Sequence, residues 1–187
     1  IVVQCTRIGY ENPYKAHYWT VLKLVFLKMY VRDVYTPIIS KRYPFMVFID
    51  LFAGTGLNAY EGAPAYIPGS TLIAWFFATY PFDKVYAVGY EPQDFICLKN
   101  RLETFIPKEN LWLKKGDANR LVNEVVKDLV KIDDKIGGVH FLAFLDPNAT
   151  ELHWSTVAKL IDLEKQGIYG DFIILLQARQ IARIIGK

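Results

Sequence analysis

The spacing of apolar residues changes its character along the chain. Near the N-terminus apolar residues recur every three or four positions, which predicts a helix from His17 to about Val34 that Pro37 ends. The residues at this helical spacing are Trp19, Leu22, Val25, Phe26, Met29 and Tyr30. By contrast, residues 45–51 are almost continuously apolar, which is typical of a strand buried on both faces of a parallel sheet.

Beyond this first strand, strand-like and helix-like segments alternate. The further predicted strands are 84–91, 111–118, 139–147 and 171–177, and the helices between them are 72–80, 93–106, 119–132 and 154–166. Ser70 or Thr71 is a candidate N-cap for the first of these helices, and residues 53–69 are predicted to be a loop. Five strands with helices between them predict an α/β protein, with a mostly parallel, doubly wound sheet in a three-layer α/β/α arrangement.

Length and composition favour one domain with a full core. The 187 residues correspond to about one domain, and 52% hydrophobic with 22% charged residues excludes global disorder. We expect a helical extension over 1–40, which includes a short strand at 1–8, and a Rossmann-like core over 41–187. The net charge of +3 is too small to indicate a nucleic-acid partner.

Several other protein classes are disfavoured. The longest apolar runs are shorter than the roughly 18 residues of a membrane span, and no signal-peptide pattern is present. Cys5 and Cys97 cannot build a disulfide framework or a zinc site by themselves, and no other group of residues has metal-ligand spacing. We therefore expect a cytoplasmic protein without a metal.

Each of the first four predicted strands has a carboxylate at its end. These residues are Asp50, Glu91, Asp117 and Asp146. In doubly wound sheets, ligands bind beyond the carboxyl ends of the strands, where the strand order reverses. Four successive acids at such ends favour a ligand site, although each acid alone is also explained as a loop or capping residue.

The glycine-rich segment after Asp50 allows more than one interpretation. Residues 54–59 fit the dinucleotide pattern G-x-G-x-x-G/A, but the prolines that follow prevent an immediate helix. Glu91 also lies 91 − 56 = 35 residues beyond the last glycine, where about 20 is expected. An oxidoreductase with a nucleotide cofactor is therefore disfavoured, and a glycine-rich turn that binds nothing stays open.

S-Adenosylmethionine fits the strand ends better, because it has no phosphates and carries a sulfonium and an amine. Glu91 is positioned to accept hydrogen bonds from both ribose hydroxyls, and Asp117 from the adenine amino group, with the Ala118 amide donating to a ring nitrogen. The methionine end is expected at the first strand end, against Asp50, Phe52, Ala53, Gly54 and Gly56.

The fourth strand end, Asp146-Pro147-Asn148, is similar to the Asp-Pro-Pro-Tyr motif of amino-methyltransferases. In that motif the acid and a backbone carbonyl accept hydrogen bonds from a target amine and so align it. Asn148 stands for the second proline and Ala149 for the aromatic residue, which puts a stacked base in doubt. A simple turn before the helix at 154–166 is the alternative.

Several segments together resemble the three-Cys-motif partner proteins, a bacterial and archaeal group. The matching segments are WTVLKL (19–24), FIDLFAGTG (48–56), GSTLIA (69–74), EPQ (91–93), GDAN (116–119) and FLDPNATELHWSTV (144–157). Thr71 and Ala149 depart from the family's usual proline and glycine. The resemblance implies a class I methyltransferase-like fold, S-adenosylmethionine and a partner with a three-cysteine motif. That fold continues to a sixth and a seventh strand, so the chain is expected to be part of a longer protein.

The resemblance leaves two functions open. The first is an S-adenosylmethionine-dependent methyltransferase of unknown acceptor, a nitrogen of nucleic acid or protein being the candidate, with Asp146, Pro147 and Asn148 positioning it. The second is a non-catalytic module that serves the cysteine-rich partner, which the altered Asp-Pro-Asn segment favours.

The remaining candidates have plain structural alternatives. Residues 57–69 are either a lid, with Tyr60 or Tyr66 closing on the ligand, or a packed surface loop. Lys15, His17, Tyr18, Trp19 and Lys23 are candidates to border a substrate cleft; the alternative, which we expect, places Trp19 in the core and Lys23 in solvent. His140 is expected to be a core histidine, and His153 is a candidate base that is better explained by capping or surface placement. Arg179, Arg183 and Lys187 share one face of a last helix, which is either a contact for a nucleic-acid backbone or, as we expect, its solvated side.

Overall fold

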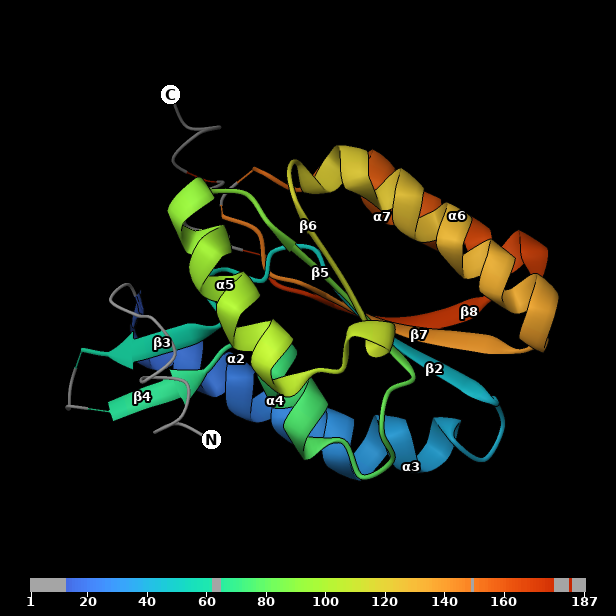
Figure 1. Cartoon of the computed structure of the whole chain (residues 1–187), viewed down its shortest axis with the longest axis horizontal. Helices are drawn as coiled ribbons and strands as arrows, with labels where there is room; N and C mark the ends of the chain where they lie inside the picture. Colours follow the sequence, from blue (N-terminus) through green and yellow to red (C-terminus); the bar gives the residue numbers. More distant parts are fainter. Residues whose placement is uncertain (1–12, 62–64, 149, 177–181, 183–187) are drawn as a thin grey trace.

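The computed structural model describes residues 13–61, 65–148, 150–176 and 182. Its main element is a five-stranded parallel sheet in the order β6-β5-β2-β7-β8 (Figure 1). The strands are β2 (Phe45–Asp50), β5 (Lys84–Gly89), β6 (Leu111–Lys115), β7 (Val139–Leu145) and β8 (Tyr169–Ile174). The five predicted strands are confirmed. The predicted strand at 1–8 and the basic helix face at 179–187 lie outside the described residues.

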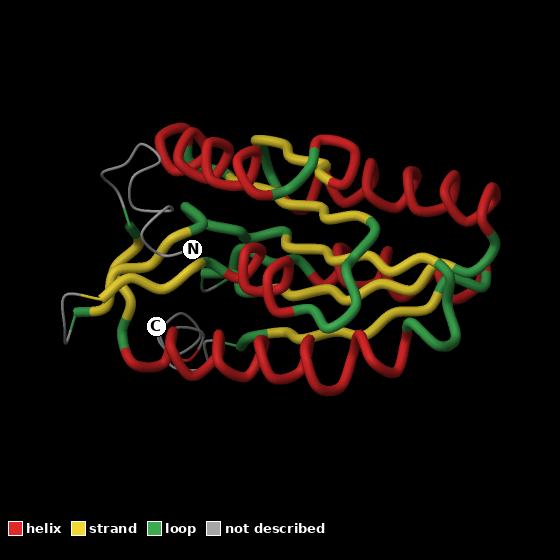
Figure 2. Tube along the Cα trace, turned by 60° about the horizontal axis from the view of Figure 1, so that its bottom comes forward, coloured by secondary structure: helices red, strands yellow, loops and turns green. Residues whose placement is uncertain are grey.

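Helices cover both faces of this sheet, which gives the predicted three-layer, Rossmann-like α/β/α fold (Figure 2). One face packs against α2 (Tyr18–Met29), α3 (Thr36–Ile39), α4 (Ser70–Phe77) and α5 (Pro92–Phe105). The other packs against α6 (Ala118–Ile136) and α7 (Trp154–Ile161). Short 3-10 helices at Lys108–Asn110 and Asp162–Gln166 lead into β6 and follow α7.

Strand β2 lies in the middle of the sheet, and this position explains why residues 45–51 are almost continuously apolar. Met46 and Phe48 point into the core beneath α2 and α4, whereas Val47 and Ile49 point into the core beneath α6 and α7. Both neighbours of β2 are parallel strands, so every residue from Met46 to Asp50 is buried. The order of the strands reverses between β2 and β7, and a ligand crevice is expected at their carboxyl ends.

The N-terminal helix differs from its prediction in two ways. It continues from α2 through a π-helical segment, Tyr30–Tyr35, into α3, so Pro37 does not end it but lies in the first turn of α3. The expected core position of Trp19 is also wrong, because this side chain is 64% exposed. Most of the predicted apolar face is in solvent with it: Leu22, Val25, Phe26 and Met29 are exposed.

Another face of α2 packs on the sheet. Leu24 and Leu27 of α2, together with Val31 of the π-helical segment, are buried in the core shared with α3, α4 and α5. Because α2 carries apolar residues all round, its periodicity does not single out one buried face. The packing of the sheet decides which stripe is covered.

The predicted loop at 53–69 is wrong in part, because it contains a β-hairpin. Strands β3 (Leu57–Tyr60) and β4 (Ala65–Pro68) are antiparallel, and β1 (Tyr14–Ala16) pairs with β3 in a small three-stranded sheet. The base of the hairpin is closed where the Gly69 amide donates to the Gly56 carbonyl, at 2.8 Å. A Cβ on Gly69 would lie 2.8 Å from the Gly56 Cα, so these backbones approach more closely than any other residue at 69 allows.

Among the described residues, no helix combines the length and the apolar character that crossing a membrane requires.

Candidate functional site

Asp50, at the end of β2, is fully buried and turned toward the start of α4. Its Oδ2 accepts hydrogen bonds from the hydroxyls of Ser70, at 2.5 Å, and Thr71, at 2.8 Å. Its Oδ1 accepts from the Phe52 amide, at 3.2 Å. Ser70 and Thr71 therefore do not cap α4 as predicted; the N-cap position belongs to Gly69.

Burial is the main influence on the pKa of the Asp50 carboxyl. It raises the pKa of Asp50 to about 6, against the hydrogen bonds from Ser70, Thr71 and Phe52, which lower it. The charge of Asp146 raises this pKa further. The ends of β2 and β7 thus bring Asp146 close enough for its charge to act on the Asp50 carboxyl. The expected contact of Asp50 with the methionine end of a cofactor stays a prediction, since in this structure its oxygens hold the start of α4.

The loop after Asp50 presents backbone to open space. Gly54 is exposed with φ at +58°, and a Cβ placed there would meet nothing within 4 Å. Gly56, with φ at +76°, instead packs against Leu98 and Arg101 of α5. Ala53 is buried and its amide donates to the Val88 carbonyl, at 3.0 Å, which ties the loop to the end of β5. Of the predicted methionine-binding segment, Gly54 is accessible to a ligand and Gly56 is a packing position.

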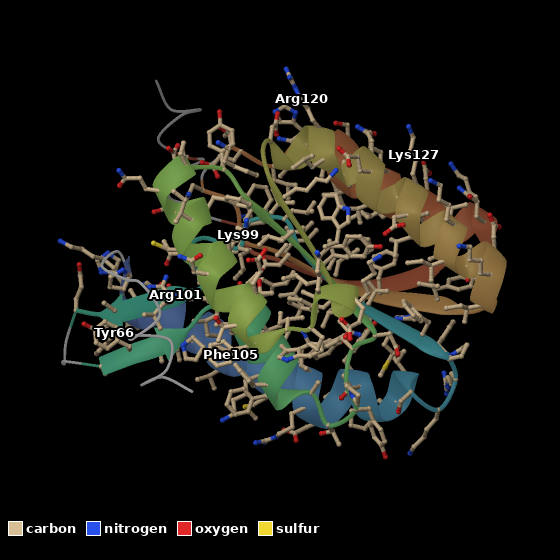
Figure 3. All side chains as sticks on the ribbon, viewed as in Figure 1. Tyr66, Lys99, Arg101, Phe105, Arg120 and Lys127 are labelled. Carbon is tan, nitrogen blue, oxygen red and sulfur yellow. The ribbon has the colours of Figure 1, made fainter. Side chains whose placement is uncertain are left out.

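Arg101 of α5 donates a hydrogen bond to this loop, and this role was not predicted from the sequence. Its side chain is fully buried, and its Nη1 donates to the Thr55 carbonyl at 2.6 Å. In Figure 3 it extends from α5 toward the segment that leads into β3. Its spacing from Leu98 and Leu102, both on the buried face of α5, was the available signal.

Glu91 follows the end of β5 and occupies the N-cap position of α5. The side chain is exposed and makes no capping hydrogen bond to the described part of this helix. Its negative charge acts on Asp94. The pKa of Asp94 is raised mainly by burial and to a smaller extent by the charge of Glu91. An exposed carboxylate at this strand end is the arrangement that recognition of two ribose hydroxyls requires.

Asp117, at the end of β6, is the N-cap residue of α6. Its Oδ1 accepts from the Asn119 amide at 2.8 Å, so the alternative explanation as a capping residue holds for this acid. The Ala118 amide opens the first helical turn, where a helix does not use its own N–H groups. Capping uses Oδ1, the side chain of Asp117 is 40% exposed, and Oδ2 lies 3.8 Å from Nε of Arg120, so the predicted adenine contact stays open.

Asn119 joins the third strand end to the fourth, and this role was not predicted. Its Nδ2 donates to the Glu151 carbonyl at 2.8 Å, and its Oδ1 accepts from the His153 amide at 3.0 Å and the Thr156 hydroxyl at 2.6 Å. The signal was its presence in the GDAN segment. His153 lies at the N-cap position of α7 with an exposed side chain, which confirms its surface placement.

The fourth strand end carries an ion pair between distant parts of the chain. Lys23 Nζ of α2 contacts Asp146 Oδ2, and the two side chains are only 24% and 18% exposed. The expected solvation of Lys23 is therefore wrong. Pro147 is buried, and Asn148 forms a turn in which its carbonyl accepts from the Glu151 amide at 3.0 Å. The predicted turn before α7 is thus present, and a role of Asp146, Pro147 and Asn148 at a methyl acceptor stays a prediction. Ala149 lies outside the described residues.

The hairpin contributes an apolar cavity near the start of α2. The cavity measures about 370 Å³ and is lined by Tyr18, Val21, Leu22, Tyr60, Ala65 and Ile67. Tyr66 is exposed on β4 (Figure 3). Residues 57–60 and 65–68 are paired strands, which favours the packed alternative over the lid.

His140 is a core histidine, as expected. It is buried, and its Nδ1 shares a hydrogen bond with the Tyr35 hydroxyl at 3.0 Å. Burial lowers the pKa of His140, while Asp171 raises it. Within the described ranges, no cluster of three or more His, Cys, Asp or Glu side chains has the arrangement of a metal site.

Comparison with protein-family models and with curated protein sequences finds no match to this chain.

Proposed function

We propose that this chain is an S-adenosylmethionine-dependent methyltransferase that acts on a nitrogen atom. The observation that carries the proposal is the parallel sheet order β6-β5-β2-β7-β8, which collects Asp50, Glu91, Asp117 and Asp146 at one edge. The ends of β2 and β7 flank the point where the strand order reverses, and this is the usual place for a ligand in such sheets.

The residues present fit this cofactor at three points. The exposed Gly54 backbone borders open space for the methionine portion, and Glu91 offers an exposed carboxylate to the ribose. Asp117 and the Ala118 amide offer an acceptor and a donor at the next strand end, as adenine requires. The buried Asp50 contributes negative charge and holds the Phe52 segment and the start of α4 in place.

Asp146 is the residue that we assign to the acceptor. Its carboxylate accepts a hydrogen bond from the target amine, and the neighbouring backbone orients the nitrogen lone pair. The cofactor would supply a methyl group on a cationic sulfur: the nitrogen lone pair would form the N–C bond, the C–S electron pair would leave with sulfur, and the surplus nitrogen proton would pass to water. The protein's contribution is alignment and electrostatics.

Calorimetry with S-adenosylmethionine tests this proposal. We expect binding by the wild type and about 10- to 100-fold weaker binding by Glu91→Ala, because two hydrogen bonds to a charged acceptor are lost. Lys99→Ala, on the exposed side of α5, is the matched control and should bind as the wild type does. Absence of binding by the wild type, or equal affinity in Glu91→Ala, would contradict the proposal.

A second candidate function is a non-catalytic module with the same fold. The exposed apolar side chains of α2, including Trp19 and Phe26, favour it, because exposed apolar patches often mark protein interfaces. Methyl transfer to any cellular fraction that disappears in Asp146→Ala would exclude this alternative.

A further inference from the structure

Lys23 and Asp146 are 123 residues apart in the chain and meet at the end of β7, where the strand order reverses. Exposed ion pairs contribute little to stability, because water screens them and two flexible side chains must be ordered. About three quarters or more of each of these side chains is removed from solvent. Removing a lysine side chain from water costs free energy, so its partner and its surroundings must account for its position.

The helix that carries Lys23 is firmly packed. Its neighbours Leu24 and Leu27 are buried in the core beneath β2 and β7, and the π-helical segment that continues α2 buries Val31 and Tyr35. The Tyr30 hydroxyl also donates to Asp171 of β8, at 2.8 Å. Lys23 is therefore delivered to Asp146 from a rigid element, as a group that orients another side chain should be.

The contact with Lys23 decides how the Asp146 carboxylate is held. The Lys23 ammonium engages Oδ2, so Oδ1 is the oxygen that we assign to a target amine. Asp146 also lies close enough to Asp50, at the end of β2, for its charge to raise the pKa of Asp50.

We propose that Lys23 is a positioning residue for methyl transfer: its ammonium holds Oδ2 of Asp146 and so fixes the orientation of this carboxylate toward the acceptor nitrogen. This inference rests on the proposed function. It adds a residue of the N-terminal helix to a site otherwise built from the strand ends.

The test follows transfer of a tritiated methyl group from S-adenosylmethionine to separated nucleic-acid and protein fractions of a cell extract. We expect Lys23→Met to lower the transfer rate at saturating cofactor by at least about tenfold, because misplacing an aligned group costs up to about 100-fold. Its dissociation constant for the cofactor, from calorimetry, should stay within about twofold of the wild type. Lys23→Arg should recover most of the rate.

Two controls separate positioning from a structural role. Lys28→Met removes a half-buried lysine of the same helix, one that lies over the Phe77 ring, and should leave the rate unchanged. In an Asp146→Asn background, Lys23→Met should cost nothing further, because residues that act as a unit are not additive. If Lys23→Met fails to fold by circular dichroism, Lys23→Gln replaces it in each comparison.

A wild-type rate in Lys23→Met, or equal impairment of Lys23→Arg and Lys23→Met, would overturn the inference. A wild type that does not bind the cofactor, or that binds it and transfers no methyl group, would instead refute the proposed function itself, so the two failures are distinguished.

Discussion

Asp50 and Glu91 stand at the ends of neighbouring parallel strands but occupy opposite environments. Asp50 is fully buried, with both oxygens hydrogen-bonded to the chain itself. Glu91 is exposed and makes no capping hydrogen bond to the described part of α5. Asp117 lies between these extremes, partly exposed and bonded to the first turn of α6.

The difference shows that one sequence feature, an acid at a strand end, leads to two environments. The carboxylate at the central strand is flanked by strands on both sides and covered by α4, and it organises the chain around it. The carboxylate farther from the centre, where its helix begins in solvent, stays exposed. The free energy of unfolding should therefore respond to these acids in the order Asp50, Asp117, Glu91.

The largest expected effect is the pH dependence that Asp50 causes. Its pKa is about 6 in the folded state against an ordinary value of 3.8, so the folded state binds the proton more tightly. Stability is then higher at acidic pH and falls as the pH rises from about 4 to about 6, by roughly 3 kcal/mol.

Urea unfolding of the wild type and of Asp50→Asn at several pH values measures this effect. The amide cannot titrate, so the free energy of unfolding of the wild type minus that of Asp50→Asn should fall over that range by the same roughly 3 kcal/mol and then level off. A difference that does not change with pH would show that Asp50 keeps its ordinary pKa in the fold.

A smaller effect is expected at Asp117. Replacement by alanine removes the N-cap hydrogen bond to the Asn119 amide and should destabilise the protein by about 1 kcal/mol. Asp117→Asn keeps a side-chain acceptor and should retain most of the stability. Chemical denaturation of both variants gives the comparison, and equal losses would mean that charge, not capping, is what Asp117 contributes.

The smallest effect on folding is expected at Glu91. Because its side chain is exposed, Glu91→Ala should change the free energy of unfolding by no more than about 0.5 kcal/mol. Chemical denaturation of Glu91→Ala measures this change. A small change also means that weaker cofactor binding by this variant is not caused by unfolding. A loss above 1 kcal/mol would make Glu91 a structural residue and would remove the contrast with Asp50.

The strands of the core were predictable because a run of apolar residues buried on both faces has few alternatives. The strong amphipathic pattern of α6 likewise predicts its buried face, with Val125 and Leu129 in the core. The hairpin was not predictable in the same way, since the glycines and prolines around it are typical of a loop. Its strands form by pairing with each other and with β1, far from them in sequence.

The candidate site divides along the same line. The acids at the strand ends could be predicted from the sequence, because each of them stands where the apolar pattern of a strand ends. Lys23, Arg101 and Asn119 act through partners 123, 46 and at least 32 residues away, and local spacing contains no record of such partners.

By itself, the sequence determined the α/β alternation, the strands of the parallel sheet and the acids that end them, because these depend on local periodicity and on which side chains water excludes. Only the tertiary structure decided which stripe of α2 is covered, which acid is buried and which lysine meets Asp146. Those outcomes depend on contacts between segments that the chain order keeps far apart, and the free energy of such contacts exists only once the layers have packed.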